Sequence, residues 1–117
     1  MRPVLLHICP RGEWRRNRSA SELRPDSLAE SGFVHLSTPE QVHLPANRLF
    51  VGRNDLVLLI LEPSRLAAPV LWEPGVPLDP ESMRFPHLYG PLPTDAVVAV
   101  VDYLPDADGR FLPPTGL

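Results

Sequence analysis

The sequence has a single cysteine, Cys9, among its 117 residues. No disulfide can form within one chain, which fits a reducing compartment. No apolar stretch approaches the roughly 20 residues needed to span a bilayer. The first residues also lack the apolar run and cleavage site of a secretory signal peptide. We therefore expect a cytoplasmic protein without membrane association, in which Cys9 is a small core residue rather than a reactive thiol.

An excess of positive charge is also missing, since 11 Lys and Arg stand against 14 Asp and Glu, giving a formal net charge of -3. General nucleic-acid binding needs clustered basic side chains, so this balance argues against it. Arginine is the dominant cation, and its guanidinium suits carboxylate and phosphate recognition. A local anion site therefore stays open.

Proline, in contrast, is abundant, with 16 residues spread along the chain. Interior proline breaks helices, so the spread disfavours a long-helix bundle and indicates short elements separated by turns. The length and the apolar fraction of 44% fit one ordinary globular domain. We expect a single domain over residues 1–117, with a core over about 4–111 and a loose tail over 112–117.

Short apolar runs predict the strands, which lie at residues 4–8, 33–37, 56–62, 70–73 and 96–104. The run at 56–62 is nearly all apolar, so it is predicted as the central buried strand. Residues 74–86 are rich in proline and acidic groups and are predicted as a loop, which in a compact domain is often functional.

Helices are expected between these strands. One is predicted at 11–18, and a helical turn at 27–30 is closed by Gly32. A third should begin at Thr38, where Pro39 and Gln41 complete a capping signal, and should run towards Asn47 or Phe50. Strands and short helices without a strict βαβ rhythm predict an α+β domain with a bent or split, mixed or antiparallel sheet flanked by short helices.

Two histidines occupy strands that are otherwise apolar. A lone strand histidine is more often a satisfied core residue, but His7 and His35 both lie at strand ends beside polar or turn residues. Alternation places Phe33, His35 and Ser37 on one face. We therefore consider a functional role for His7 and His35 alongside the structural one.

Other polar residues have a plainer structural explanation beside the functional one. His87 follows the proline-rich segment and could simply fix it through backbone hydrogen bonds. Glu73 follows a predicted strand and could end it in water. His43 is assigned to the solvated face of its helix.

Established motifs for catalysis and cofactors are missing. There is no HxH, HExxH or CxxC pattern for a metal, and no GxSxG elbow around Ser37. GxGxxG and GxxxxGK[ST] phosphate loops are absent as well. We expect no metal, although histidines from distant segments could still meet in space. The remaining option is a pocket that holds NAD through His7, His35 and Glu73, with Arg48 or Arg84 neutralising phosphate.

Several segments together resemble a known family. They are residues 5–8, the stretch Gly32-Phe33-Val34-His35-Leu36-Ser37-Thr38-Pro39-Glu40-Gln41, residues 46–48, residues 71–74 and residues 85–92 around His87. In this combination the chain resembles the DUF952 family of uncharacterised, mostly bacterial small proteins. The resemblance extends from residue 4 to about residue 111.

The resemblance implies an ADP-ribosyltransferase-like fold, a split β-sheet that binds NAD in a cleft. Within that group the chain is similar to the histidine-rich branch that includes the RNA 2′-phosphotransferases, whose His-Val-His-Leu stretch resembles residues 33–36. It implies that His7 contacts the NAD ribose, that His35 packs against nicotinamide, and that Glu73 is the third active-site group. The chain is shorter than an RNA 2′-phosphotransferase, and His87 has no transferase equivalent.

The expected function is therefore NAD-dependent ADP-ribosyl transfer, with a small nucleotide ligand and an acceptor that the sequence does not identify. The expected catalytic residues are His7, His35 and Glu73. The expected cofactor-binding residues are His7, His35, Ser37, Thr38, Arg48, His87 and Tyr89. Two alternatives remain open, namely a non-catalytic module that binds a nucleotide or other small molecule, and a histidine metal site.

Overall fold

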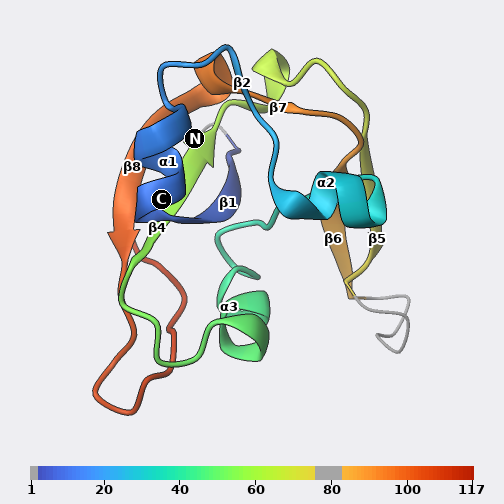
Figure 1. Cartoon of the computed structure of the whole chain (residues 1–117). Coiled ribbons are helices and arrows are strands. Elements are labelled where there is room, and N and C mark those ends of the chain that lie inside the picture. The colour runs from blue at the N-terminus through green and yellow to red at the C-terminus, as the bar shows by residue number, and fades with distance from the viewer. Residues whose placement is uncertain (1–2, 76–82) are drawn as a thin grey trace.

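A computed structural model describes residues 3–75 and 83–117 (Figure 1). The strands are β1 (Leu5–Pro10), β2 (Glu22–Leu23), β3 (Val34–His35), β4 (Leu56–Leu61), β5 (Val70–Pro74), β6 (Arg84–Leu88), β7 (Leu92–Pro93) and β8 (Val97–Tyr103). The helices are α1 (Arg11–Asn17), α2 (Asp26–Ser31) and α3 (His43–Leu49), with 3-10 turns at Pro63–Arg65 and Thr94–Ala96. None of the helices in these residues is long and apolar enough to cross a membrane.

The strands form separate antiparallel sheets rather than one continuous sheet. The first has the order β1-β4-β8, the second has the order β3-β6-β5, and β2 pairs with β7. In Figure 1 the first sheet and the β5–β6 pair stand on opposite sides of the molecule, with α2 beside β5 and β6 and α3 below the space between the sheets. The α+β class and the split antiparallel sheet predicted from the sequence are confirmed.

Strand β4 is apolar along its whole length because both of its faces are covered. All six of its residues are buried. Val57, Leu59 and Leu61 belong to one core cluster, whereas Leu56, Leu58 and Ile60 belong to the other. Side chains alternate between the faces of a strand, so β4 divides two cores. The predicted central position of this strand is confirmed.

A short bridge joins the first two sheets. The amide of Leu6 donates to the carbonyl of Ser37 at 2.7 Å, and the amide of Ser37 donates to the carbonyl of Leu6 at 2.8 Å. On its other side the same segment is held by β6, since the amide of Leu36 donates to the carbonyl of Pro86 at 3.0 Å. This segment therefore brings the middle of β1 next to the end of β3.

The prediction of a loop over residues 74–86 is wrong at its C-terminal end, and its first residue, Pro74, is the last residue of β5. Residues from Arg84 onward form β6, the central strand of the second sheet, and Phe85, Pro86, His87 and Leu88 are buried. Proline is unusual in a central strand because it lacks a backbone donor. Here the Pro86 carbonyl still accepts a hydrogen bond from the amide of Leu36, directly after β3. The part of the predicted loop at 76–82 lies outside the described residues.

The start of the third helix also differs from the prediction. Part of the expected cap exists, because the Thr38 amide donates to Oε1 of Gln41 at 3.4 Å, but residues 38–41 form a turn and the helix begins at His43. The reason is Pro45, which has no amide to donate. A helix that began at Pro39 would place Pro45 in its interior, whereas a start at His43 places Pro45 in the first turn, where no amide donor is needed.

The C-terminal segment is fixed to α3. Asn47 Nδ2 donates to the carbonyl of Phe111 at 2.8 Å, and the Phe111 amide donates back to Asn47 Oδ1 at 2.7 Å. The Phe111 side chain is buried in the second core cluster. Within the residues expected to form a loose tail, the Leu112 carbonyl accepts a hydrogen bond from Tyr103 at 2.7 Å, and Leu117 packs against the same cluster.

Replacing Asn47 by Ala should lower the free energy of unfolding by about 2 kcal/mol, because the Phe111 amide and carbonyl both lose their partner. Urea denaturation measures this loss. The matched control is Asn54→Ala at an exposed position, which should change stability by less than about 0.5 kcal/mol. Equal effects in the two variants would contradict a structural role for the Asn47–Phe111 pair.

Candidate functional site

A pocket of about 460 Å³ lies among β1, α2, α3 and the segment that follows β3. Its size is within the range of small-molecule sites, and its wall is mostly apolar with a few polar groups, as is typical of such sites. The polar side chains that line it are those of His7, Glu13, Asp26, Ser27, His35, Ser37, Arg48 and His87. Three of the four histidines of the sequence therefore meet at one cavity.

His7 lies on β1 and is buried. Its Nδ1 is 2.9 Å from the carbonyl oxygen of His35. A carbonyl can only accept, so Nδ1 carries the proton and Nε2 keeps its lone pair. Burial lowers the pKa of His7 to about 4, against 6.5 for the ring in water. His7 is therefore a neutral imidazole at pH 7 with one nitrogen free to accept.

His35 ends β3 and has an exposed side chain on the pocket wall. Partial desolvation lowers its pKa, and the nearby His87 and Arg48 lower it further. The centroid of the Phe33 ring lies 4.8 Å from that of His35 in an edge-on arrangement. The centroid of the His87 ring lies 5.4 Å away, with the two rings nearly perpendicular. His35 is thus held by aromatic neighbours while still facing the cavity.

His87 lies directly opposite His35 in the β3–β6 register and is 3% exposed. Its Nδ1 is 2.8 Å from Oε1 of Glu73, so Nδ1 donates to the carboxylate. Phe33 stacks on the same ring at 4.0 Å with an interplanar angle of 13°. Nε2 is buried without a hydrogen-bond partner. A buried polar atom without a partner costs roughly 1–3 kcal/mol, so a ligand that donates to Nε2 would recover this free energy.

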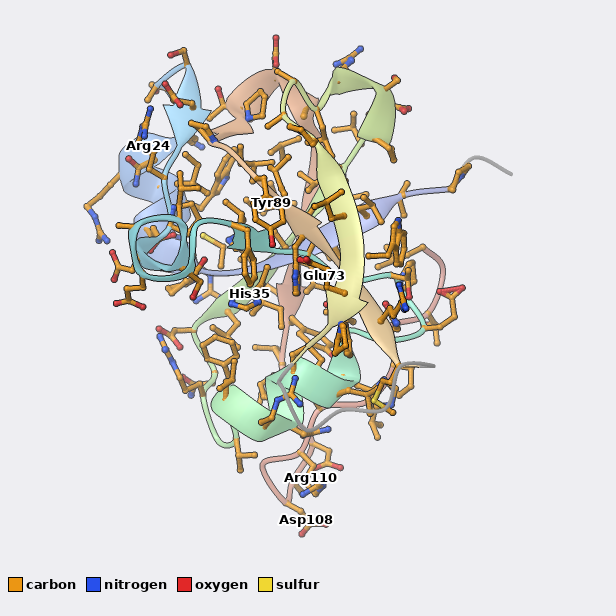
Figure 2. The ribbon with its side chains drawn as sticks, turned by 90° about the vertical axis from the view of Figure 1, so that its right-hand side faces the viewer. Arg24, His35, Glu73, Tyr89, Asp108 and Arg110 are labelled. Carbon is orange, nitrogen blue, oxygen red and sulfur yellow. The ribbon has the colours of Figure 1, made fainter. Side chains whose placement is uncertain are left out.

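Glu73 lies on β5 behind His87 and is not part of the pocket lining. Its Oε1 accepts from the hydroxyl of Tyr89 at 2.6 Å and from His87. The Tyr89 hydroxyl and then His87 lower the pKa of the carboxyl group, which keeps it ionised. Figure 2 shows Glu73 and Tyr89 close together with His35 nearby. The carboxylate therefore acts on the pocket only through His87.

The structure brings together most of the residues predicted for the site. His7, His35, Ser37, Arg48 and His87 all line the pocket. Tyr89 joins Glu73 behind His87 instead. The Thr38 side chain is not among the lining groups. Its backbone amide is bound to Gln41, whose own amide group donates to the Arg84 carbonyl at 2.6 Å.

Other residues of the site were missed from the sequence. Glu13, Asp26 and Ser27 line the pocket from α1 and α2, and only the short connections between predicted elements pointed to their position. Phe33 was placed on the same face as His35 by alternation, but its stacking on His87 was not foreseen. The expectation that His43 lies on a solvated face is wrong in part, because its side chain is half-buried and its Nδ1 is buried without a partner.

Potential metal ligands come together at one place in the described part of the chain. The residues are His7, Cys9 and Glu13, and one ligand atom from each lies within 4.8 Å of the other two. The set of His7, His35 and His87 does not form such a group among the same residues. The geometry of the three pocket histidines therefore favours contacts with a bound ligand over shared coordination of one ion.

Lowering the pH should destabilise the protein through His7. Below pH 6.5 the unfolded chain binds a proton that the folded chain, with a pKa of about 4 at His7, does not bind. This contribution is fully present above pH 6.5 and is lost as the pH falls towards 4, with a total of about 3 kcal/mol. Urea denaturation at a series of pH values measures it. His7→Gln retains a donor for the His35 carbonyl and should lack this part of the slope, whereas parallel profiles would contradict the assignment.

Comparisons with known proteins identify relatives of the whole domain. The family model described as "Protein of unknown function (DUF952)" matches residues 8–100. A crystal structure of protein CC0527 from Caulobacter crescentus is 34% identical, with a TM-score of 0.76 and 93% of each chain covered. A solution NMR structure of CC0527 is 33% identical, with a TM-score of 0.75 and coverage of 92% of this chain and 90% of that chain. None of the curated proteins matches the chain. The family match spans most of the domain and includes two of the three pocket histidines, His35 and His87, and the chain belongs to the DUF952 family.

Proposed function

We propose that the pocket binds a nucleotide of the NAD type and that the protein is an ADP-ribosyltransferase-like enzyme. The observation that carries the proposal is the buried, unpartnered Nε2 of His87, whose ring lies in the wall of a cavity shared with His7 and His35. A ligand hydroxyl would supply the missing hydrogen bond. Ribose offers neighbouring hydroxyls, and the apolar part of the wall suits an aromatic base or the nicotinamide ring.

Each polar group of the pocket has a role in this proposal. His7 Nε2 accepts from a ribose hydroxyl, since Nδ1 is already used by the His35 carbonyl. The exposed ring of His35 packs against nicotinamide. Arg48 supplies positive charge on the α3 side of the wall, where it suits the diphosphate. Ser37, next to the bridge to β1, is a further hydrogen-bonding group.

The position of Glu73 changes its expected role. It cannot contact the anomeric carbon directly, because it lies behind His87 rather than in the pocket lining. In the proposed reaction the acceptor oxygen attacks the anomeric carbon, and the bond to nicotinamide breaks with its electron pair moving to the ring nitrogen. The acceptor proton passes to His87 Nε2, and Glu73 stabilises the imidazolium that forms. His87 is then the general base and Glu73 is the positioning residue.

The second candidate is a binding module that has the pocket but performs no transfer. It is favoured by the placement of Glu73, whose Oε1 accepts hydrogen bonds from Tyr89 and His87 outside the cavity. Both candidates require the same ligand. They differ only in whether bound NAD loses nicotinamide.

Calorimetric titration with NAD tests binding. We expect His87→Ala and His35→Ala to weaken NAD binding at least about tenfold, which corresponds to the loss of about 1.4 kcal/mol. His43→Ala is the matched histidine control outside the pocket lining and should bind NAD as the wild type does. Melting temperatures of the variants separate loss of binding from loss of folding. No binding by the wild type would overturn the proposal.

Release of nicotinamide from NAD separates the two candidates. Glu73→Gln leaves an oxygen that can accept from Tyr89 and His87 but removes the negative charge, so binding should persist while release falls by about 10²–10⁴-fold. A wild type that binds NAD without releasing nicotinamide, in the presence of nucleophilic acceptors, would identify the protein as a binding module.

A further inference from the structure

We infer that His7, Cys9 and Glu13 form a binding site for a transition-metal dication of the zinc type in the wall of the pocket. One ligand atom from each residue lies within 4.8 Å of the other two. The three donors are an imidazole nitrogen, a thiol sulfur and a carboxylate oxygen. The site shares His7 with the proposed nucleotide pocket, so an ion on His7 Nε2 would take the place of the ribose contact proposed for that nitrogen. Its other donors, Cys9 and Glu13, have no part in the proposed reaction.

The local chain path creates the cluster. His7 and Cys9 are two residues apart on β1, so their side chains leave the same face of the strand. Helix α1 begins at Arg11, directly after β1, and its first turn brings Glu13 back over the strand. The Arg11 amide donates to the Asp55 carbonyl at 2.7 Å, which fixes this turn against the chain before β4. The ligands therefore come from one short, well-anchored segment.

The distances are close to those of a tetrahedral site. With zinc bonds of about 2.0–2.3 Å, neighbouring ligand atoms are roughly 3.5 Å apart. Cys9 Sγ and Glu13 Oε2 are already 3.6 Å apart. No two ligand atoms of the cluster are more than 4.8 Å apart, so the largest separation exceeds the tetrahedral spacing by roughly 1 Å.

The surroundings favour an ion over an empty cluster of polar groups. His7 donates its Nδ1 proton to the His35 carbonyl, which fixes the ring and leaves Nε2 to bind. Metal-bound histidines commonly have such a backbone or carboxylate partner. Three protein ligands with one open position are typical of zinc sites that bind a further ligand, and imidazole, thiolate and carboxylate are all zinc ligands. Two of the three ligand residues, His7 and Glu13, line the pocket, which would give a further ligand access to the ion.

Charge supports the same assignment. Cys9 Sγ and Glu13 Oε2 are 3.6 Å apart, a distance at which a thiolate and a carboxylate would repel one another. The thiol instead donates to Glu13. A dication would displace this proton and balance the negative charges of the thiolate and the carboxylate.

The test is titration of the tag-free, chelator-treated full chain with Co²⁺, followed by competition with Zn²⁺. We expect one equivalent of Co²⁺ to produce a thiolate-to-cobalt charge-transfer absorption, which Zn²⁺ abolishes. Cys9→Ser should lose the charge-transfer band, and Glu13→Gln should weaken Co²⁺ binding at least about tenfold. Because Cys9 is in the core, Glu13→Gln at a half-buried position tests the site even if the cysteine variant does not fold.

Matched controls separate this site from the nucleotide site. Glu30→Gln at an exposed position of α2 should bind Co²⁺ as the wild type does. His87→Ala should keep the charge-transfer band while losing NAD, so a failure of either proposal leaves the other measurable. Absence of the band in the wild type, or binding that depends on His87 but not on Glu13, would overturn the inference.

Discussion

The pair of hydrogen bonds between Leu6 and Ser37 is the constraint on which the site depends. It joins two sheets that would otherwise be separate, and it sets β1 against the segment after β3. The ring of His7 then meets the carbonyl of His35, and the side chain of His35 meets His87 across the β3–β6 pair. Each histidine is therefore positioned by backbone pairing, which is less adaptable than side-chain packing.

The same constraint explains the electrostatics of the pocket. Histidines brought this close cannot all be charged, because like charges disfavour one another and buried rings lose hydration. His7 is neutral through burial, and His35 has a lowered pKa. The carboxylate of Glu73 contacts only His87 among the three. In the pocket, His87 is therefore bonded to a carboxylate, whereas His7 is bonded to a backbone carbonyl and His35 packs against aromatic rings.

Much of the framework could be predicted from the sequence. The apolar run of β4 and the alternation around His35 are local signals, and each gave the correct element. His7 and His35 were predicted to belong to one site because both lie at strand ends beside polar or turn residues, and because the family resemblance gives each a role in the same cleft. Strand β6 was missed because Pro86 and the acidic residues before it have the composition of a loop, and only pairing on both sides makes the segment a strand.

The arrangement of Glu73 could not be predicted for a different reason. Its distance from the pocket depends on the register between β5 and β6, which sets Glu73 opposite Phe85 and Leu71 opposite His87. Register depends on long-range pairing and turn geometry rather than on composition. The late start of α3, in contrast, follows from Pro45 alone and could have been read from the sequence.

The pocket wall is assembled from both sheets and from α2 and α3, and in the described part of the chain the Leu6–Ser37 bridge is the backbone pairing that joins the two sheets. A molecule seated there touches all of them at once. It would hold the two halves of the domain together, so that separation of the β3-β6-β5 sheet from the β1-β4-β8 sheet is coupled to release of the ligand. Ligand binding to the pocket would therefore raise the free energy needed to separate the two sheets.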